Sequence, residues 1–368
     1  MRKILVLHNS LNSCGGGERV CLHTIKALQE AGYRVVLGVV ERTDWDRVLS
    51  LTAVRLEEIP EEFYILRKLR TFGIYQRFFT IFHYLKKRAD LIINTHGDVL
   101  PLPAHITYMH FPTFALTENP YAYSKYQSSL FWRAYFEPYR ILQKLNMFTI
   151  RRSVILTNSS YSRDMIKKYI GAESIVVHPP VDLKDYLELN SDNKRDQVIT
   201  ISRFSPEKRL HLIPYIARQL LLDNIDFVLI GSTSTPIYRR YYRKVTAVRD
   251  KLGVENLKII PDAPHEVKLR ELEKSKVYLH LMKYEHFGIS VIEALASKCI
   301  PVCHASGGIW TDIRMCYFYI TEKEIPDLIL KALDDYSQFP FTDYFIKEFS
   351  DEKFRERMLK VVECVLSS

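Results

Sequence analysis

The sequence predicts an α/β protein made of two doubly wound domains, each a parallel sheet covered by helices. With 368 residues, the chain is about twice the usual domain length. Short runs of β-branched and apolar residues alternate with longer amphipathic stretches, which is typical of parallel sheets with crossover helices. Two similar series of these runs follow one another, so we expect two domains, although a single large barrel also fits the length.

The composition is that of a globular protein with a sizeable core. Hydrophobic residues make up 47% and charged residues 26% of the chain, which excludes disordered and collagen-like proteins. No run approaches the ~20 apolar residues of a membrane span, and residues 1–10 are too short an apolar run for a signal peptide. The six cysteines form no CxxC pair, which favours a reducing cytosol over a disulfide framework or a zinc cluster.

The expected strands fall into two groups of six. In the first half they are residues 4–8, 34–40, 91–94, 106–109, 154–157 and 174–178, and in the second half 198–202, 227–230, 257–260, 277–281, 300–304 and 316–320. Residues 178–197 contain Pro179 and Pro180 followed by polar residues, and we interpret them as a linker. We therefore expect a first domain over 1–180, a second over 181–345 and a C-terminal segment over 346–368 with an amphipathic helix from 351 to 366.

The positive charge is concentrated in two segments of the first half. The chain carries a formal charge of +9, yet residues 63–88 hold seven basic residues, eight aromatic residues and no acidic residue. Residues 121–152 hold six basic residues, nine aromatic residues and one acidic residue. Helices that combine basic and aromatic residues in this way suit an anionic membrane surface. Core helices with long basic side chains that reach water remain an equal alternative, and nucleic-acid binding a weaker one.

Three loops after strands are candidate ligand sites, because ligands of open parallel sheets bind at the carboxyl ends of the strands. The first loop contains Gly15, Gly16 and Gly17 directly before a helix over 18–31. Glycines allow close approach of the backbone to a ligand, and the amides at a helix start favour an anion or a sugar oxygen. The spacing is not a dinucleotide fingerprint, and a simple tight turn is the structural alternative.

The second loop carries Arg203 and Lys208 on either side of Pro206, which can start a helix. Two cations at the end of a strand could hold a diphosphate, the arginine by a planar fork and the lysine as a point charge. Solvated surface charges are the alternative interpretation.

The third loop gives the most specific prediction. Glu285 follows a strand, Gly288 opens the next helix, and Glu293 lies in its early turns. Backbone amides of Gly288, Ile289, Ser290 and Val291 would face a phosphate at the positive end of the helix dipole. The two carboxylates could accept hydrogen bonds from hydroxyl groups on either side of that phosphate. A nucleotide sugar has such hydroxyl groups, on its sugar and on its ribose.

The residues of this third loop resemble glycosyltransferase family 4. Its members carry two glutamates separated by seven residues, which Glu285 and Glu293 match, together with Phe287, Gly288, Ala294 and Pro301. SRFSPEKR, PPVD and the glycines 307 and 308 also match, so the resemblance covers most of the chain. It implies a GT-B fold, in which two Rossmann-like domains face each other across a cleft, and a retaining transferase with a nucleotide-sugar donor.

The resemblance also implies roles for single residues. Arg203 and Lys208 would contact the diphosphate, Glu285 the sugar hydroxyls, and Glu293 the ribose. His110 follows an expected strand and is similar to the family histidine that lies near the transferred sugar; His8 and His96, which end or follow strands too, are weaker candidates. The donor site would thus comprise Gly16, Gly17, Arg203, Lys208, Glu285, Phe287, Gly288, Ile289, Ser290 and Glu293, with His110, Arg203, Lys208 and Glu285 as the catalytic set.

Within the family, CGGGERV, THGD and YMHFPT are most similar to the α-1,2-mannosyltransferases that extend dolichyl-diphosphate-linked oligosaccharide at the cytosolic membrane face. The resemblance therefore implies a lipid-linked glycan acceptor, a cytoplasmic enzyme attached peripherally to the membrane, and GDP-mannose as donor, with UDP-glucose close behind. The loop 261–265 is expected to contact the base.

No cofactor or metal is expected. Asp44, Trp45 and Asp46 form the DxD motif of a different glycosyltransferase fold, and we interpret it as a coincidence. A GT-B phosphorylase or epimerase, and a non-catalytic sugar- or nucleic-acid-binding protein with the same fold, are the rival functions.

Overall fold

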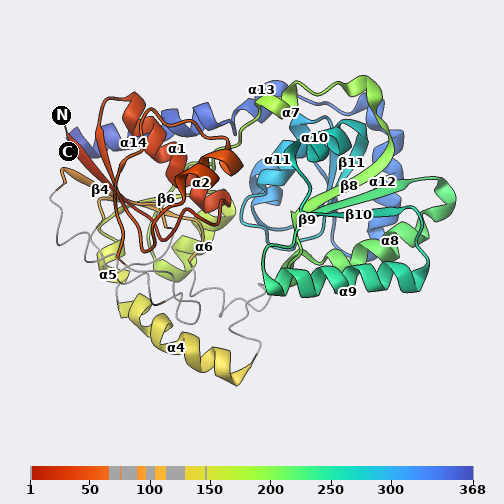
Figure 1. The fold of residues 1–368 in the computed structure, drawn as a ribbon, viewed down its shortest axis with the longest axis horizontal. Helices are drawn as coiled ribbons and strands as arrows, with labels where there is room; N and C mark the ends of the chain where they lie inside the picture. Colours follow the sequence, from red (N-terminus) through yellow and green to blue (C-terminus); the bar gives the residue numbers. More distant parts are fainter. Residues whose placement is uncertain are drawn as a thin grey trace. The chain divides into compact units, whose positions relative to one another are not determined.

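The computed structural model describes residues 2–65, 75, 89–96, 104–112, 129–145 and 147–367. The chain divides into two compact units. The N-terminal unit comprises Met1–Pro180 and Phe349–Ser368, and the C-terminal unit comprises Val181–Glu348. Each contains a parallel sheet with helices on its faces (Figure 1), which confirms the predicted fold class of two doubly wound domains.

The described part of the N-terminal unit holds a seven-stranded parallel sheet in the order β3-β2-β1-β4-β5-β6-β7. The strands are β1 (Lys3–Leu7), β2 (Arg34–Gly38), β3 (Glu61–Phe63), β4 (Leu91–Asn94), β5 (Ile106–Met109), β6 (Val154–Thr157) and β7 (Ile175–Val176). The helices are α1 (Gly16–Glu30), α2 (Trp45–Thr52), α4 (Leu130–Leu145), α5 (Met147–Ile150), α6 (Ser160–Ile170) and α14 (Asp351–Ser367). Chain order reverses between β1 and β4.

The C-terminal unit holds a six-stranded parallel sheet in the order β10-β9-β8-β11-β12-β13. The strands are β8 (Arg195–Arg203), β9 (Asp226–Ser232), β10 (Leu257–Pro261), β11 (Ser275–His280), β12 (Ile300–His304) and β13 (Tyr317–Tyr319). The helices are α7 (Lys184–Leu187), α8 (Ile213–Gln219), α9 (Pro236–Leu252), α10 (His265–Lys274), α11 (Ile289–Ala296), α12 (Ile325–Asp334) and α13 (Asp343–Lys347). Chain order reverses between β8 and β11.

Alternating strand residues build the core of each unit. In the C-terminal unit, Phe227, Leu229, Val277 and Leu279 point from the strands into a cluster closed by side chains of α8, α9 and α12. Successive strand residues face opposite sides of the sheet. The middle residues of β8, β9 and β11 are buried on both faces and are mostly apolar.

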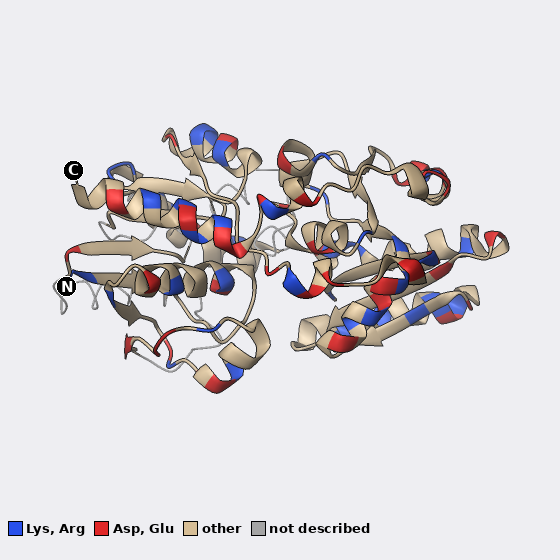
Figure 2. Cartoon of the chain, turned by 90° about the horizontal axis from the view of Figure 1, so that it is seen from above, with Lys and Arg blue, Asp and Glu red and all other residues tan. Residues whose placement is uncertain are grey.

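The last helix, α14, packs on α1 of the N-terminal unit (Figures 1 and 2). Phe354, Met358 and Val362 of α14 are fully buried in the same core as Val20 and Leu28 of α1. Figure 2 shows acidic and basic positions along the rest of α14. The apolar stripe therefore holds the helix in place, and its charged face stays outside the core.

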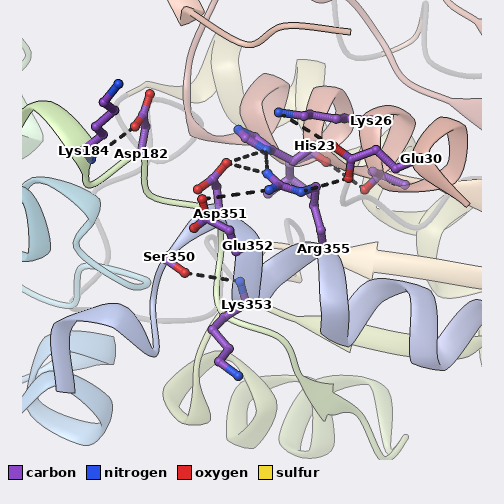
Figure 3. A network of polar contacts seen from close by, with 12 residues as sticks. His23, Lys26, Glu30, Asp182, Lys184, Ser350, Asp351, Glu352, Lys353 and Arg355 are labelled. Carbon is purple, nitrogen blue, oxygen red and sulfur yellow. Dashed lines mark hydrogen bonds and ion pairs between the residues drawn. The ribbon is translucent and has the colours of Figure 1, made fainter. Parts of the chain in front are cut away.

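A polar network at the start of α14 adds to this packing (Figure 3). Arg355 pairs with Asp351 one turn earlier at 2.5 Å and reaches Glu30 of α1 at 3.2 Å. His23 of α1 is 4% exposed, and its Nδ1 lies 3.6 Å from an Asp351 carboxylate oxygen. Burial and the nearby Arg355, Arg19 and Lys26 charges lower the pKa of His23 to about 3, so the imidazole is neutral in the folded protein at pH 7.

The structure differs from the prediction between the two series of strands. Residues 178–197 were expected to be a linker, which is wrong for most of their length: Val181, Leu183 and Tyr186 are buried, α7 forms at 184–187, and β8 begins at Arg195. Strand β3 was not expected, and Pro206 starts a 3₁₀ helix (Pro206–Lys208) rather than an α-helix. The segments 63–88 and 121–152 were expected to suit a membrane surface; of these, residues 66–74, 76–88, 121–128 and 146 lie outside the described residues.

Candidate active site

Two predicted site residues of the C-terminal unit form an ion pair. Lys208 follows β8 and Glu285 follows β11, and the Lys208 Nζ lies 2.5 Å from the Glu285 Oε2. Because β8 and β11 are neighbours where the strand order reverses, the loops that follow them meet at the same edge of the sheet. Such a reversal is the usual ligand-binding point of a doubly wound sheet.

A histidine also contacts the carboxylate of this ion pair. His280, the last residue of β11, places its Nε2 3.4 Å from the Glu285 Oε2. Burial alone would raise the pKa of Glu285, but the charge of Lys208 and the contact with His280 outweigh it and hold that pKa well below its usual range. Glu285 is thus an anion with 17% of its side chain exposed, able to accept hydrogen bonds from a ligand.

Glycines fix the position of the Glu285 loop. A Cβ on Gly307 would collide with the Glu285 carbonyl oxygen, and one on Gly308 with the His286 carbonyl oxygen. The Gly308 amide also donates to the Glu285 carbonyl at 2.8 Å. Only glycine permits this approach of the loop after β12 to the loop after β11.

The start of α11 supplies the second acidic residue. Gly288 caps this helix with a φ of 109°, a conformation that favours glycine, and Ile289 and Ser290 form its first turn. Glu293 is 6% exposed and accepts a hydrogen bond from Lys268 Nζ of α10 at 2.8 Å. Lys268 also donates to the Tyr186 hydroxyl at 2.5 Å, so the lysine that contacts Glu293 is itself held by a residue of α7.

The remaining predicted residues of this unit have distinct surroundings. Arg203 ends β8 as an exposed side chain and donates from Nη1 to the Tyr238 hydroxyl at 3.1 Å. Phe287 is buried beneath the loop. In the loop 261–265, expected to contact a base, Asp262 accepts a hydrogen bond from the Thr233 backbone amide at 2.7 Å.

In the N-terminal unit, the glycine-rich loop follows β1, at the reversal of strand order. His8 directly follows β1, and its Nδ1 lies 3.1 Å from the Thr95 hydroxyl, which follows β4. Glu18 of α1 accepts the Gly15 amide at 2.8 Å. Burial opposes protonation of His8. The charge interactions and hydrogen bonds with Cys21 and Glu18 outweigh this effect and raise the pKa of His8 to about 10.

His110 and the glycine-rich loop are in close contact. A Cβ on Gly17 would lie 3.3 Å from the His110 Nε2, tighter than an ordinary contact. Gly16 is the first residue of α1, and His96 packs edge-on against His8 with ring centroids 5.6 Å apart. The sheet thus gathers His8 and His96 at one edge, with His110 against the glycines.

Sequence reasoning missed three partners in the C-terminal unit: His280, Lys268 and Tyr186. His280 could have been found, because it ends a strand five residues before Glu285. Lys268 and Tyr186 had no local signal, since the bonds from Lys268 to Glu293 and to Tyr186 arise only from the packing of α7, α10 and α11.

The first aspartate of the Asp44–Asp46 motif has a structural role. Asp44 is the N-cap of α2 and accepts the Arg47 amide at 3.3 Å. Among the described residues, no group of three or more His, Cys, Asp or Glu side chains is placed to hold a metal ion.

The chain is similar to known glycosyltransferases along most of its length. The family model "Glycosyltransferase Family 4" matches residues 14–185, and "Glycosyl transferases group 1" matches residues 184–338. The GDP-Man:Man(3)GlcNAc(2)-PP-Dol alpha-1,2-mannosyltransferase of Xenopus laevis is 24% identical over 91% of this chain and 78% of its own length. The Homo sapiens protein of the same name is 26% identical with the same two coverages.

Solved structures share the fold. Anabaena HepE in complex with UDP and glucose matches with a TM-score of 0.71 at 15% identity, over 99% of this chain and 100% of that chain. Sucrose-phosphate synthase from Thermosynechococcus elongatus matches with a TM-score of 0.73 at 14% identity, over 100% of both chains. The two family models together match residues 14–338, so the chain belongs to glycosyltransferase family 4, has the GT-B fold and is a glycosyltransferase.

Proposed function

We propose that this enzyme transfers mannose from GDP-mannose, with retention of configuration, to a lipid-linked oligosaccharide at the cytosolic face of a membrane. The names of its relatives support this choice of donor and acceptor. The arrangement of Lys208, Glu285 and Glu293 around the start of α11 is the single observation that carries the proposal, because it offers a cation and two carboxylates at a helix N-terminus.

Each group has a role in the proposed donor complex. The diphosphate binds the first amides of α11, Lys208 and Arg203, since helix N-termini and cations both attract anions. Glu285 accepts hydrogen bonds from hydroxyl groups of the transferred sugar, and Glu293 accepts hydrogen bonds from the ribose hydroxyls. Lys208 already neutralises Glu285, so a diphosphate that reaches Lys208 is not repelled by an isolated carboxylate.

The proposed reaction breaks the bond between the sugar C1 and the diphosphate oxygen and forms a bond from C1 to an acceptor hydroxyl oxygen on the same face. The hydroxyl proton passes to the departing diphosphate, so no enzymic nucleophile is needed. Catalysis then consists of positioning and of stabilising the charge that develops on the leaving group. In the proposal, His110 hydrogen-bonds the transferred sugar.

The proposed membrane surface is the outer face of α4 and α5. Leu130, Phe131, Leu145 and Phe148 are 83%, 70%, 75% and 65% exposed, whereas the opposite face buries Phe136, Tyr139 and Gln143. Lys144 lies beside this apolar face, and the Arg152 guanidinium lies 4.3 Å from the Phe148 ring centroid. Apolar side chains flanked by cations suit insertion among anionic headgroups. Among the described residues, no helix combines the length and hydrophobicity of a membrane span.

Sedimentation with vesicles tests this surface. The protein is expected to bind vesicles that contain phosphatidylglycerol more strongly than vesicles of phosphatidylcholine alone, and to lose binding when Phe131 and Leu145 are both replaced by serine. Leu222→Ser is the control, because Leu222 is 98% exposed but lies in the C-terminal unit. Equal binding by the double variant and the wild type would contradict the proposal.

A transfer assay tests the activity. Purified protein is incubated with a short-chain lipid-diphosphate oligosaccharide and either GDP-mannose or UDP-glucose, and the product is detected by mass spectrometry and NMR. We expect addition of one α-linked mannose with GDP-mannose. Transfer only from UDP-glucose would refute the donor assignment, an inverted linkage the retaining mechanism, and no transfer from either donor the proposed activity.

A further inference from the structure

A groove in the N-terminal unit lies apart from the glycine-rich loop but is tied to it. The groove has a volume of about 700 Å³, within the range of roughly 300–1,000 Å³ that is usual for ligand pockets. It lies where β2 and β3 end and α2 begins. The described residues that line it are Arg42, Thr43, Asp44, Trp45, Asp46, Ile59, Pro60, Glu62 and Tyr64.

The Glu62 carboxylate holds one wall of this groove in place. Glu62 accepts the Thr43 backbone amide with Oε1 and the Trp45 indole Nε1 with Oε2, each at 2.8 Å. Both carboxylate oxygens are therefore used to position the loop and the ring. An aromatic side chain fixed by its polar edge is a preorganised contact surface, because little conformational freedom is lost when a ligand binds.

Two polar side chains that line the groove make no hydrogen bond within the described residues. Thr43 is 5% exposed, and its hydroxyl has no hydrogen-bond partner in the structure. A buried hydroxyl without a partner is costly, and a ligand in the groove would remove that cost. Asp46 is exposed in the first turn of α2, and no hydrogen bond or ion pair engages its carboxylate within the described part of the chain.

The Asn12 side chain joins the groove loop to the glycine-rich loop. Asn12 accepts the Asp44 amide with Oδ1 at 2.9 Å and donates from Nδ2 to the Arg42 carbonyl at 3.0 Å. The Val40 amide donates to the Asn9 carbonyl at 3.0 Å. A ligand in the groove therefore contacts a loop whose position is set by the residues that precede Gly15–Gly17.

The charge of the groove selects the kind of ligand. Asp44, Asp46 and Glu62 outnumber the single cation Arg42, so a phosphate or an anionic headgroup would be repelled. Carboxylates and a threonine hydroxyl instead suit the hydroxyl groups of an uncharged saccharide, and the Trp45 and Tyr64 rings offer apolar surface to its C–H face.

We propose that this groove is the subsite for the oligosaccharide part of the acceptor, with Thr43 and Asp46 hydrogen-bonding sugar hydroxyls. This rests on the proposed function, since it assigns a place to the glycan of that acceptor. The groove binds uncharged sugar rings and leaves the lipid diphosphate to other parts of the protein.

Two isosteric variants test the proposal with little risk to the fold. Thr43→Val removes the hydroxyl, and Asp46→Asn removes the negative charge and replaces one acceptor oxygen by an NH2 group. Neither side chain makes a structural hydrogen bond in the described part of the chain. Glu57→Gln is the matched control, because Glu57 is exposed and does not line the groove. Loss of one hydrogen bond to a ligand costs about 1.4 kcal/mol, which is about tenfold in affinity.

The first measurement is steady-state transfer. We expect Thr43→Val and Asp46→Asn each to raise the KM for the oligosaccharide acceptor about tenfold, while the KM for GDP-mannose stays near its wild-type value and Glu57→Gln changes neither. An unchanged acceptor KM in both variants would overturn the groove assignment and leave the proposed transfer reaction intact.

The second measurement does not depend on transfer. Saturation-transfer NMR with free mannotriose as probe is expected to show binding to the wild type and to Glu57→Gln, and a much weaker signal with either groove variant. Added inorganic pyrophosphate is expected not to displace the mannotriose. If the wild type binds no mannotriose, or the groove variants bind it equally well, the groove is not a saccharide site.

Discussion

Lys208 and Glu285 form an ion pair at 2.5 Å although 77 residues separate them in the chain. The contact exists because β8 and β11 are neighbours at the reversal of strand order. It joins the loop that offers cations to the loop that offers carboxylates. Breaking a buried pair from one side costs more than the pair itself contributes, because the other charge is left without its partner.

Replacing Lys208 by methionine is expected to lower kcat/KM about a hundredfold, because one preorganised charge toward the leaving diphosphate is lost. It should also raise the pKa of Glu285, since the charge of Lys208 is the main influence that lowers it against burial. The acid limb of the pH–rate profile should therefore move to higher pH. Steady-state kinetics over a pH series measures both effects.

The control for this prediction is Lys347→Met, which removes an exposed lysine of the same unit. It should leave rate and profile unchanged. Near-wild-type turnover in both Lys208→Met and Arg203→Ala would remove these two cations from the site.

The sequence was sufficient to predict the positions of most strands along the chain and the residues that follow them. Eleven of the twelve expected strands lie within two residues of an observed boundary at each end because β-branched runs on both faces of a parallel sheet leave a clear apolar pattern. β3 was missed, since its three residues Glu61–Phe63 are largely acidic and form a strand only by pairing with β2. The local sequence carries no such information.

The candidate site was predictable where one loop contained it and not where packing builds it. Glu285, Gly288 and Glu293 lie within one short segment. Lys268 bonds both Glu293 and Tyr186 and so joins three elements. The linker prediction failed for the same reason, because Tyr186 is buried by tertiary packing.

Gly17→Ala is expected to reduce kcat about tenfold, a loss of about 1.4 kcal/mol of transition-state stabilisation, while the protein stays folded. The new Cβ would lie 3.3 Å from the His110 Nε2, so the imidazole must shift by a few tenths of an ångström. Small displacements of a positioned group are costly in catalysis. Kinetics with thermal unfolding as a fold control measure the effect.

A double-variant cycle shows whether the loss of kcat in Gly17→Ala is caused by a displacement of His110. If Gly17→Ala acts by moving the imidazole, adding it to His110→Ala should cause little further loss. Fully multiplicative losses would mean that Gly17 acts on the substrate independently of His110.

Transfer is expected to survive a chelator. Lys208 and Arg203 carry positive charge toward the proposed diphosphate, and the first amides of α11 add the positive end of the helix dipole, so these groups can do the work of a divalent cation. Initial rates are measured with EDTA and again after addition of magnesium or manganese. Complete loss with EDTA that either ion restores would refute the prediction.

The stability of the N-terminal unit is expected to fall as the pH drops below about 6.5, because His23 is held neutral in the folded state. Burial and the Arg355 charge lower its pKa from 6.5 to about 3. Between these two values the unfolded chain binds a proton that the folded chain does not, so stability increases with pH there and is lost on acidification. The slope from this group is at most about 1.4 kcal/mol per pH unit. Urea unfolding at pH 7, 6 and 5 measures it.

His23→Gln should flatten this pH dependence, because glutamine cannot take up the proton, even if the variant is less stable at pH 7. His265→Gln serves as the control, since His265 lies on the surface with about half of its side chain exposed and contacts Asp185, and it should keep the wild-type slope. The Asp351 carboxylate, 3.6 Å from His23, would favour a protonated imidazole, but the Arg355 guanidinium already pairs with it. A wild-type slope in His23→Gln would show that other groups cause the acid sensitivity and that His23 titrates near its ordinary pKa in the folded protein.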